Sequence, residues 1–392
     1  MDTERLSQLT EPLLSWYDEH ARVLPWRENP LPYYVWVSEI MLQQTRVEAV
    51  KPFFARFIEA LPDVASLAAC PEEKLLKLWE GLGYYNRVRN MQKAAQRIME
   101  DFGGEMPDSR EGLLSLPGIG SYTAGAIASI AFGKPVPAVD GNVLRVISRL
   151  CGNEEDISRQ SVKTMFEQAV QTVMPSGRPG AFNQALMELG ATVCLPNGMP
   201  ECERCPVKES CYAREKGCQL RLPVKASPKA RRVEEKTVLV IRDSERTAVR
   251  KRPAKGLLAG LYELPNYPGH LDQDEVLACV RDSGFSPIRV LPLSGAKHIF
   301  SHVEWHMTGY MILVEDQEPD EEGFVLREQT GKKDGQLLFV EPERTEREYP
   351  IPAAFGAYTK YVSIRLGQDR YVQKEREEEF EDENTISGNP LL

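Results

Sequence analysis

The sequence predicts two domains, a mainly α-helical first half and an α+β second half. Residues 1–215 carry apolar side chains at three- and four-residue spacing between short Gly/Pro breaks, as in Lys74–Trp79, which is typical of amphipathic helices. Residues 216–235 are basic and contain proline without a periodic pattern, which indicates a linker. Beyond it, Thr237–Ile241 and Tyr310–Val314 have the composition of strands. A length of 392 residues also favours two domains over one.

We expect the second domain to span 236–368, with helices near 272–283 and 352–366 between its strands. The last segment, 369–392, is acidic and poor in apolar residues, as in Lys374–Glu379. Such a segment cannot bury enough apolar surface to offset chain entropy, so we expect an acidic, disordered tail.

The net charge of −10 does not exclude DNA binding, because the charge is uneven along the chain. Residues 208–232 hold eight Lys/Arg and two Glu, whereas 301–392 hold ten Lys/Arg and 21 Asp/Glu. Charges act over about a Debye length, roughly 8–10 Å, so the acidic end says little about the first half. The sequence contains no run of 18 apolar residues, so we expect no membrane-spanning helix. With no signal-peptide pattern either, we expect a cytoplasmic protein.

Half of the eight cysteines are clustered, which favours a metal site over a disulfide framework. The cluster comprises Cys194, Cys202, Cys205 and Cys211. Four sulfurs without a nearby histidine fit either zinc or an iron–sulfur cluster, and their spacing does not decide between them. Six residues separate Cys211 from a fifth candidate, Cys218, so a quartet of Cys202, Cys205, Cys211 and Cys218 is also open.

A glycine-rich hairpin, Leu116–Gly120, precedes a helix that we expect to start near Tyr122. Gly118 and Gly120 allow positive φ and bring amide N–H groups close to an anion at the positive end of that helix. The hairpin therefore predicts a phosphate contact, although an ordinary turn between two helices has the same composition.

Two acids stand in apolar surroundings. Glu39 shares a helix face with Val35, Trp36 and Leu42, where desolvation favours a protonated carboxyl and a general acid. Asp140 precedes a helix that we expect to begin near Asn142. The alternatives are a structural buried acid for the first and a plain helix N-cap for the second.

Several motifs in one order resemble a known superfamily. Leu116–Gly120, Val139–Val143 and the four cysteines resemble the helix–hairpin–helix DNA glycosylases of the endonuclease III type. Within that superfamily, Trp36–Thr45 and Gly81–Arg87 are similar to the MutY-type adenine DNA glycosylases. The similarity covers about residues 24–212 and implies a helical glycosylase domain with an iron–sulfur cluster, followed by a MutT/Nudix-like α+β domain.

The resemblance gives roles to individual residues. Glu39 corresponds to the general acid that protonates adenine at N7, and Asp140 to the carboxylate that stabilises an oxocarbenium-like sugar or bonds to it. Tyr122 and Asn142 would be their partners. Enzymes of the endonuclease III type carry a lysine nucleophile where this chain has Tyr122, so efficient strand cleavage is not expected.

A base inside a duplex must be flipped out before excision. Gln44 and Tyr84 correspond to the residues that wedge into the duplex beside 8-oxoguanine. The resemblance also implies an adenine pocket and neighbouring DNA contacts from Trp26, Leu42, Gln43 and Gln184. For Tyr84 and Trp26 alone, core packing is an equally good interpretation.

The implied cofactor is a [4Fe–4S] cluster on Cys194, Cys202, Cys205 and Cys211. This chain has seven residues between the first two of these, where the family usually has six, so the quartet that includes Cys218 remains an alternative. The resemblance also allows a monovalent or divalent cation at the helix–hairpin–helix.

In the second half, Gly256–Pro265 resembles the approach to a Nudix box, but Cys279–Gly284 lacks the carboxylates that would hold Mg²⁺. Pyrophosphate hydrolysis is therefore not expected. Phe300, Ser301 and His302 correspond to a segment that reads the damaged base, although a strand end with polar residues is the simpler interpretation.

The sequence thus predicts a monomeric enzyme that removes adenine opposite 8-oxoguanine or guanine in double-stranded DNA. A catalytically silent mismatch-binding protein is the main alternative. It is disfavoured because binding alone requires neither Glu39 nor Asp140.

Overall fold

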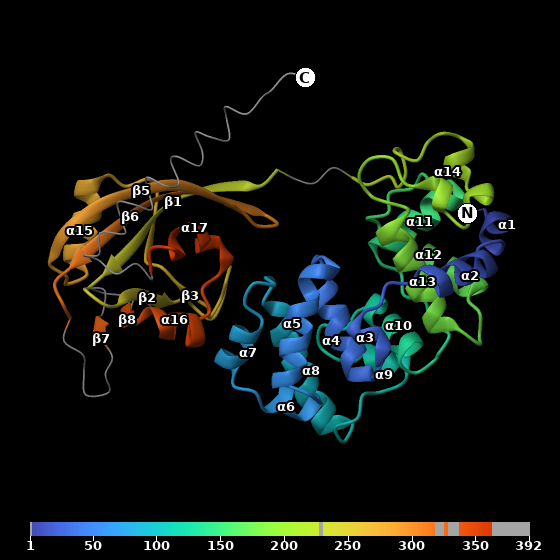
Figure 1. Ribbon diagram of the computed structural model, residues 1–392, viewed down its shortest axis with the longest axis horizontal. Helices are drawn as coiled ribbons and strands as arrows, with labels where there is room; N and C mark the ends of the chain where they lie inside the picture. The colour runs from blue at the N-terminus through green and yellow to red at the C-terminus, as the bar shows by residue number, and fades with distance from the viewer. Residues whose placement is uncertain (1, 227–229, 318–324, 328–336, 363–392) are drawn as a thin grey trace, which may run out of the picture. The chain divides into compact units, whose positions relative to one another are not determined.

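The computed structural model describes residues 2–226, 230–317, 325–327 and 337–362. The chain divides into two compact units, Met1–Pro228 and Lys229–Leu392, and each is described by itself (Figure 1). The first is helical and the second contains a sheet, which confirms the predicted fold class. Within the described residues, no helix is long and apolar enough to cross a membrane.

The first unit is built from helices and two short 3₁₀ turns. Their bounds are α1 (Thr3–Ser7), α2 (Thr10–His20), α3 (Pro25–Glu28), α4 (Pro32–Leu42), α5 (Val47–Ala60), α6 (Val64–Ala69), α7 (Glu72–Leu78), α8 (Asn86–Asp101), α9 (Arg110–Leu114), α10 (Ser121–Ile130), α11 (Gly141–Cys151), α12 (Gln160–Val173), α13 (Pro179–Thr192), η1 (Cys202–Arg204), η2 (Lys208–Ser210) and α14 (Tyr212–Glu215).

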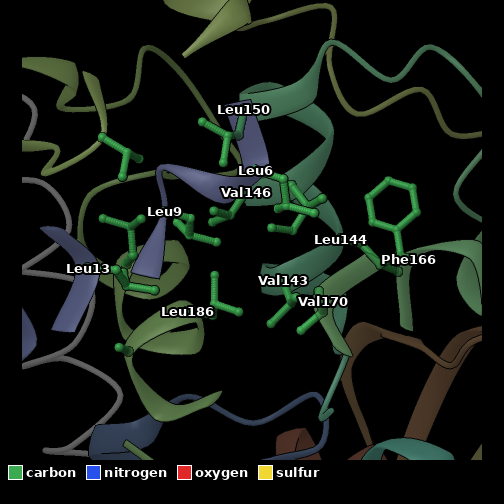
Figure 2. Close-up of a cluster of buried hydrophobic side chains, with 14 of the residues drawn as sticks. Leu6, Leu9, Leu13, Val143, Leu144, Val146, Leu150, Phe166, Val170 and Leu186 are labelled. Carbon is green, nitrogen blue, oxygen red and sulfur yellow. The ribbon is translucent and has the colours of Figure 1, made fainter. Parts of the chain in front are cut away.

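One core cluster joins the N-terminal helices to the middle of this unit. Leu6 lies in α1, Leu9 in the turn that follows it and Leu13 in α2. Figure 2 shows these three side chains beside side chains of α11, α12 and α13. All three leucines are fully buried. Burying such a side chain contributes roughly 1.5–3 kcal/mol, so this cluster fixes α11, whose first turn carries a predicted catalytic residue.

Two glycines let helices approach the start of α11 and the segment before it closely. A Cβ atom on Gly125 of α10 would lie 1.9 Å from the carbonyl oxygen of Pro137, and one on Gly190 of α13 would lie 2.5 Å from the Cβ of Asn142. Both distances are below van der Waals contact. Any larger residue at either position would therefore push α10 or α13 away from the segment that carries Asp140.

The described part of the second unit forms an eight-stranded sheet. Six of its strands have the order β5-β6-β1-β2-β8-β7, while β3 pairs with β2 and β4 pairs with β1. β1 and β6 are parallel, and the other strand pairs of the described residues are antiparallel. The bounds are β1 (Arg232–Arg242), β2 (Thr247–Lys251), β3 (Tyr262–Glu263), β4 (Asn266–Pro268), α15 (Gln273–Asp282), β5 (Pro287–Ile299), β6 (Val303–Val314), β7 (Val325–Arg327), β8 (Leu337–Val340), α16 (Pro342–Glu348), η3 (Ala353–Phe355) and α17 (Gly356–Thr359).

The structure differs from the expected limits in two places. The basic segment 216–235 is folded at both ends, because Cys218 and Leu222 are buried against Ala213 and β1 already begins at Arg232. The helix expected at 352–366 is a 3₁₀ turn followed by four helical residues, since this segment turns to bury Phe355 and Tyr358 in the core of the second unit. Residues 363–368 and the tail 369–392 lie outside the described residues.

Candidate active site

Glu39 lies on α4, a helix that is buried along most of its length. In α4, all residues from Val35 to Met41 are buried, and the exposed fraction of Glu39 is 6%. Pro32 occupies the first turn, where its missing N–H costs no hydrogen bond. The helix therefore places one carboxyl group in an apolar interior, as the sequence predicts.

The hydroxyl of Tyr122 on α10 donates a hydrogen bond to Glu39 Oε2. Burial raises the pKa of Glu39 from 4.5 to about 7, and the bond from Tyr122 only partly opposes this rise. The negative charge of Asp140 makes a smaller contribution to the same rise in the pKa of Glu39. A carboxyl with this pKa is about half protonated at neutral pH, as general acid catalysis requires.

Asp140 is both a helix cap and a wall of the site. It is the N-cap of α11, and its Oδ1 accepts from the Val143 N–H at 2.8 Å. Its Oδ2 accepts from the side-chain amide of Asn142 at 2.7 Å. Burial raises the pKa of Asp140, while these donors oppose the rise because they favour the ionised form. The N-cap interpretation is therefore confirmed, and the position of Asp140 in the cavity wall is compatible with the catalytic one.

The side chain of Asn142 is in turn held by a hydrogen bond from Arg145. Arg145 Nη2 donates to Asn142 Oδ1 at 2.9 Å, and Arg145 Nε donates to the Cys194 carbonyl oxygen at 2.7 Å. Arg145 is buried, with an exposed fraction of 7%. The orientation of the amide toward Asp140 is thus set by an arginine that sequence reasoning did not single out, although it lies three residues further along the same helix.

A cavity of about 1110 Å³ brings the predicted residues together. Both acids and both of their partners line it, as do five of the residues expected to contact the base or DNA: Trp26, Leu42, Gln43, Gln44 and Gln184. Its volume exceeds the ~300–1,000 Å³ of typical small-molecule sites, so it has room for an extruded nucleotide.

Sequence reasoning missed an ionic triad in the same wall. Glu188 is nearly fully buried and lines the cavity with Arg22 and Arg27. Arg22 Nε donates to Glu188 Oε1 at 2.6 Å, and Arg27 Nη2 donates to Oε2 at 2.8 Å. Burial alone would raise the pKa of Glu188, but the two arginines outweigh it and lower that pKa. No spacing signal links residues about 160 positions apart.

The four predicted cysteine ligands line a second, small cavity of about 30 Å³. Arg149 lies in its wall and donates to Cys194 Sγ at 3.3 Å. Cys218 is not in this wall and is buried in a separate small cluster. Within the described part of the chain, no three His, Cys, Asp or Glu side chains are placed to hold a single metal ion.

Comparison with known proteins agrees with this geometry. Residues 37–172 match the HhH-GPD superfamily of base excision DNA repair proteins, and 237–361 match a NUDIX domain. The adenine DNA glycosylase of Rattus norvegicus is 36% identical, over 78% of this chain and 70% of that protein. For the Homo sapiens enzyme the identity is 35%, over 81% and 69%. The chain belongs to the adenine DNA glycosylase family.

The glycosylase also resembles a solved structure, that of a thermostable thymine-DNA glycosylase. The TM-score is 0.50 at 28% identity, over 54% of this chain and 98% of that one. The protein is therefore a base excision repair enzyme that acts on DNA.

Three predicted DNA-contacting residues of the first unit lie outside the large cavity. Tyr84 is 50% exposed and has φ +49°. Gln44, which lines the cavity, also has a positive φ, +59°. Gly118 has φ +79°, and a Cβ there would lie 2.7 Å from the Cβ of Asn90. Gly120 is the N-cap of α10 with an ordinary φ of −95°. A cation at this hairpin stays a prediction.

The predicted lesion-reading segment of the glycosylase connects β5 to β6 in the second unit. Phe300 is partly buried, with its ring 4.8 Å from that of Trp305. Ser301 and His302 are exposed. The aromatic residue therefore anchors the loop, whereas the two polar residues lie at its surface.

Proposed function

We propose that this glycosylase removes adenine from duplex DNA by hydrolysing its N-glycosidic bond. One observation carries the proposal: Glu39 and Asp140 line the same cavity in different electrostatic surroundings. Two carboxyl groups with separate duties on either side of a glycosidic bond are the usual solution for this chemistry.

Glu39 is the proposed general acid. Because Tyr122 donates to Oε2, the proton of the neutral carboxyl resides on the other oxygen, which can deliver it to N7 of adenine. A protonated adenine is a better leaving group. The pKa near 7 keeps the acid available at neutral pH without making it too weak to give the proton up.

Asp140 is the proposed stabiliser of positive charge on the sugar. The donors from Val143 and Asn142 hold both carboxylate oxygens in fixed directions, so little reorganisation is needed when charge develops. Arg145 acts on Asp140 indirectly, because its hydrogen bond to Asn142 limits rotation of the amide that donates to Asp140. Water then completes the hydrolysis.

Tyr122 also determines what the enzyme does not do. A phenol cannot form a Schiff base with the sugar, so we propose a monofunctional glycosylase. The product is then an abasic site in an unbroken strand.

We propose that the base opposite adenine is 8-oxoguanine or guanine. Adenine is a normal base, so its partner must mark it for removal. 8-Oxoguanine differs from guanine at the C8 oxygen and the N7 hydrogen. Ser301 supplies a hydroxyl donor and acceptor and His302 a ring nitrogen, and both are exposed at one loop.

We further propose that Cys194, Cys202, Cys205 and Cys211 hold a [4Fe–4S] cluster. Their side chains line one cavity, and Cys218 does not. Four cysteine side chains around one space fit either zinc or an iron–sulfur cluster, and the resemblance to the endonuclease III type favours the cluster. When bound, the cluster would cross-link the loop after α13 to the turns η1 and η2.

Product analysis tests the proposal. A duplex with adenine opposite 8-oxoguanine is incubated with excess enzyme, and free adenine and strand breaks are measured with and without alkali. We expect adenine release with breaks only after alkali. Tight binding by the wild-type protein without adenine release would instead support a silent mismatch binder.

A pyrophosphohydrolase remains disfavoured. The described helix α15 offers Asp274, Glu275 and Asp282, but the Arg-Glu and Glu-Glu pairs of a Nudix box are missing from its sequence. Release of phosphate or pyrophosphate from nucleoside triphosphates would overturn that conclusion.

A further inference from the structure

Arg87, in the first turn of α8, connects two loops through backbone carbonyl groups. Its side chain is half-buried, and no carboxylate pairs with it among the residues that the structure describes. Burial lowers the pKa of Arg87 to about 10, so it is still charged at neutral pH. Nη1 donates to Ile40, Met41 and Gln43 at 2.6, 3.2 and 2.8 Å, and Nη2 donates to Leu82 and Gly83 at 3.0 and 3.2 Å.

The residue that follows each set of acceptors has an unusual backbone. Gln44 follows the end of α4 with φ +59°, and Tyr84 follows Gly83 with φ +49°. Only one other non-glycine residue in the described chain has a positive φ. Such left-handed residues are strained and persist only where neighbouring contacts hold them. The carbonyl groups that precede both of them are held by the same guanidinium.

The same guanidinium also contacts the Tyr84 side chain. Its central carbon is 5.6 Å from the centre of the Tyr84 ring and 5.3 Å from that of Trp79. Trp79 Nε1 in turn donates to the Gly83 carbonyl oxygen at 3.0 Å. A cation over aromatic rings attracts their faces, so Arg87 orients the ring of Tyr84 as well as the backbone before it.

We propose that Arg87 is a positioning residue that joins Gln44 and Tyr84 into a single two-pronged wedge for extrusion of adenine. The proposal rests on the proposed function, because the wedge acts while the base is flipped out. An arginine is required because only its planar fork offers enough N–H donors in two directions to serve both loops. A lysine keeps the charge but has one nitrogen.

The test compares Arg87→Lys with the wild-type protein. A 2-aminopurine placed beside the target adenine reports loss of stacking by its fluorescence, and the single-turnover excision rate and the dissociation constant are measured separately. We expect Arg87→Lys to lose most of the fluorescence rise and to slow excision by about tenfold or more. Affinity for a duplex that already contains an abasic site should be nearly unchanged, because no base needs to be extruded.

Arg89→Lys is the matched control. Arg89 lies two residues further along α8, and its Nε pairs with Glu72 of α7 at 2.7 Å. We expect this variant to keep the wild-type fluorescence and rate. Equal defects in the two variants would mean that loss of an arginine on this helix acts generally, and the proposal would be wrong.

A double-mutant cycle separates positioning from folding. If Arg87 acts through Tyr84, the variant with both Arg87→Lys and Tyr84→Ala should be little slower than Tyr84→Ala alone. Fully additive defects, or a normal fluorescence rise in Arg87→Lys, would overturn the proposal. If the wild-type protein releases no adenine, the proposed function fails, and the fluorescence rise still decides the role of Arg87.

Discussion

Replacing Glu39 with glutamine should abolish excision and, above neutral pH, stabilise the protein. Burial raises the pKa of Glu39 from 4.5 to about 7. At about 1.4 kcal/mol for each pH unit between the two values, the ionised carboxyl costs the folded state roughly 3 kcal/mol. Glutamine has no proton to lose and still accepts the hydrogen bond of Tyr122, so it avoids this cost.

The effect depends on pH in a defined direction. Below about pH 4.5, Glu39 is protonated in both the folded and the unfolded protein, and its ionisation costs nothing. As the pH rises from about 4.5 to 7, the unfolded chain releases the proton while the folded protein keeps it, so the wild-type stability falls. Above pH 7 the whole cost is present.

Urea unfolding of the wild-type and Glu39→Gln proteins at pH 5 and pH 8 measures this difference. We expect the variant to be more stable by up to about 3 kcal/mol at pH 8, and by less than about 1 kcal/mol at pH 5. Wild-type excision should also slow above pH 7, because only about a tenth of Glu39 is protonated at pH 8. A variant that is less stable than wild type at both pH values would show that Glu39 is a structural acid and refute the reasoning.

Three further predictions concern other parts of the account. Asp140→Asn should keep the cap of α11 but lose excision by a factor of about 100 or more, as single-turnover rates would show, because the charge that faces the sugar is gone; a near wild-type rate would contradict its role. Cys211→Ser should lower the iron content from about four per chain, whereas Cys279→Ser, in the other unit, should not; metal analysis that finds stoichiometric zinc in the wild type would contradict the cluster. Joint replacement of Ser301 and His302 by alanine should reduce the ratio of excision rates opposite 8-oxoguanine and guanine at fixed salt, and an unchanged ratio would place lesion reading elsewhere.

The sequence predicted local features of the site well. An acid on an apolar helix and an acid before a helix are short-range patterns, and the structure places both in one cavity. The N-cap alternative for Asp140 is confirmed, because one oxygen caps α11 while the other accepts a hydrogen bond from Asn142. A single residue can satisfy both requirements when the helix start forms the wall of the site.

Long-range contacts could not be predicted from spacing. Glu188 meets Arg22 and Arg27 only because α13 packs beside the N-terminal segment, and each residue alone reads as an ordinary surface charge. Arg87 belongs to the motif Gly81–Arg87, but the positioning role proposed for it depends on backbone carbonyl groups, which have no signature in the sequence.

Domain limits also depend on burial rather than composition. The segment after α14 is basic and looks like a linker, yet Leu222 is buried and its carbonyl oxygen accepts from Arg149. Apolar residues spaced a few positions apart in a charged stretch give too weak a pattern to predict this packing.

The most direct test of the central claim is the rate of adenine release from three matched duplexes. Adenine is placed opposite 8-oxoguanine, guanine or thymine, and single-turnover rates are measured with enzyme above the dissociation constant at one salt concentration. We predict the fastest release opposite 8-oxoguanine, slower release opposite guanine and none opposite thymine. Equal rates for all three duplexes, or release only of a base other than adenine, would contradict the account.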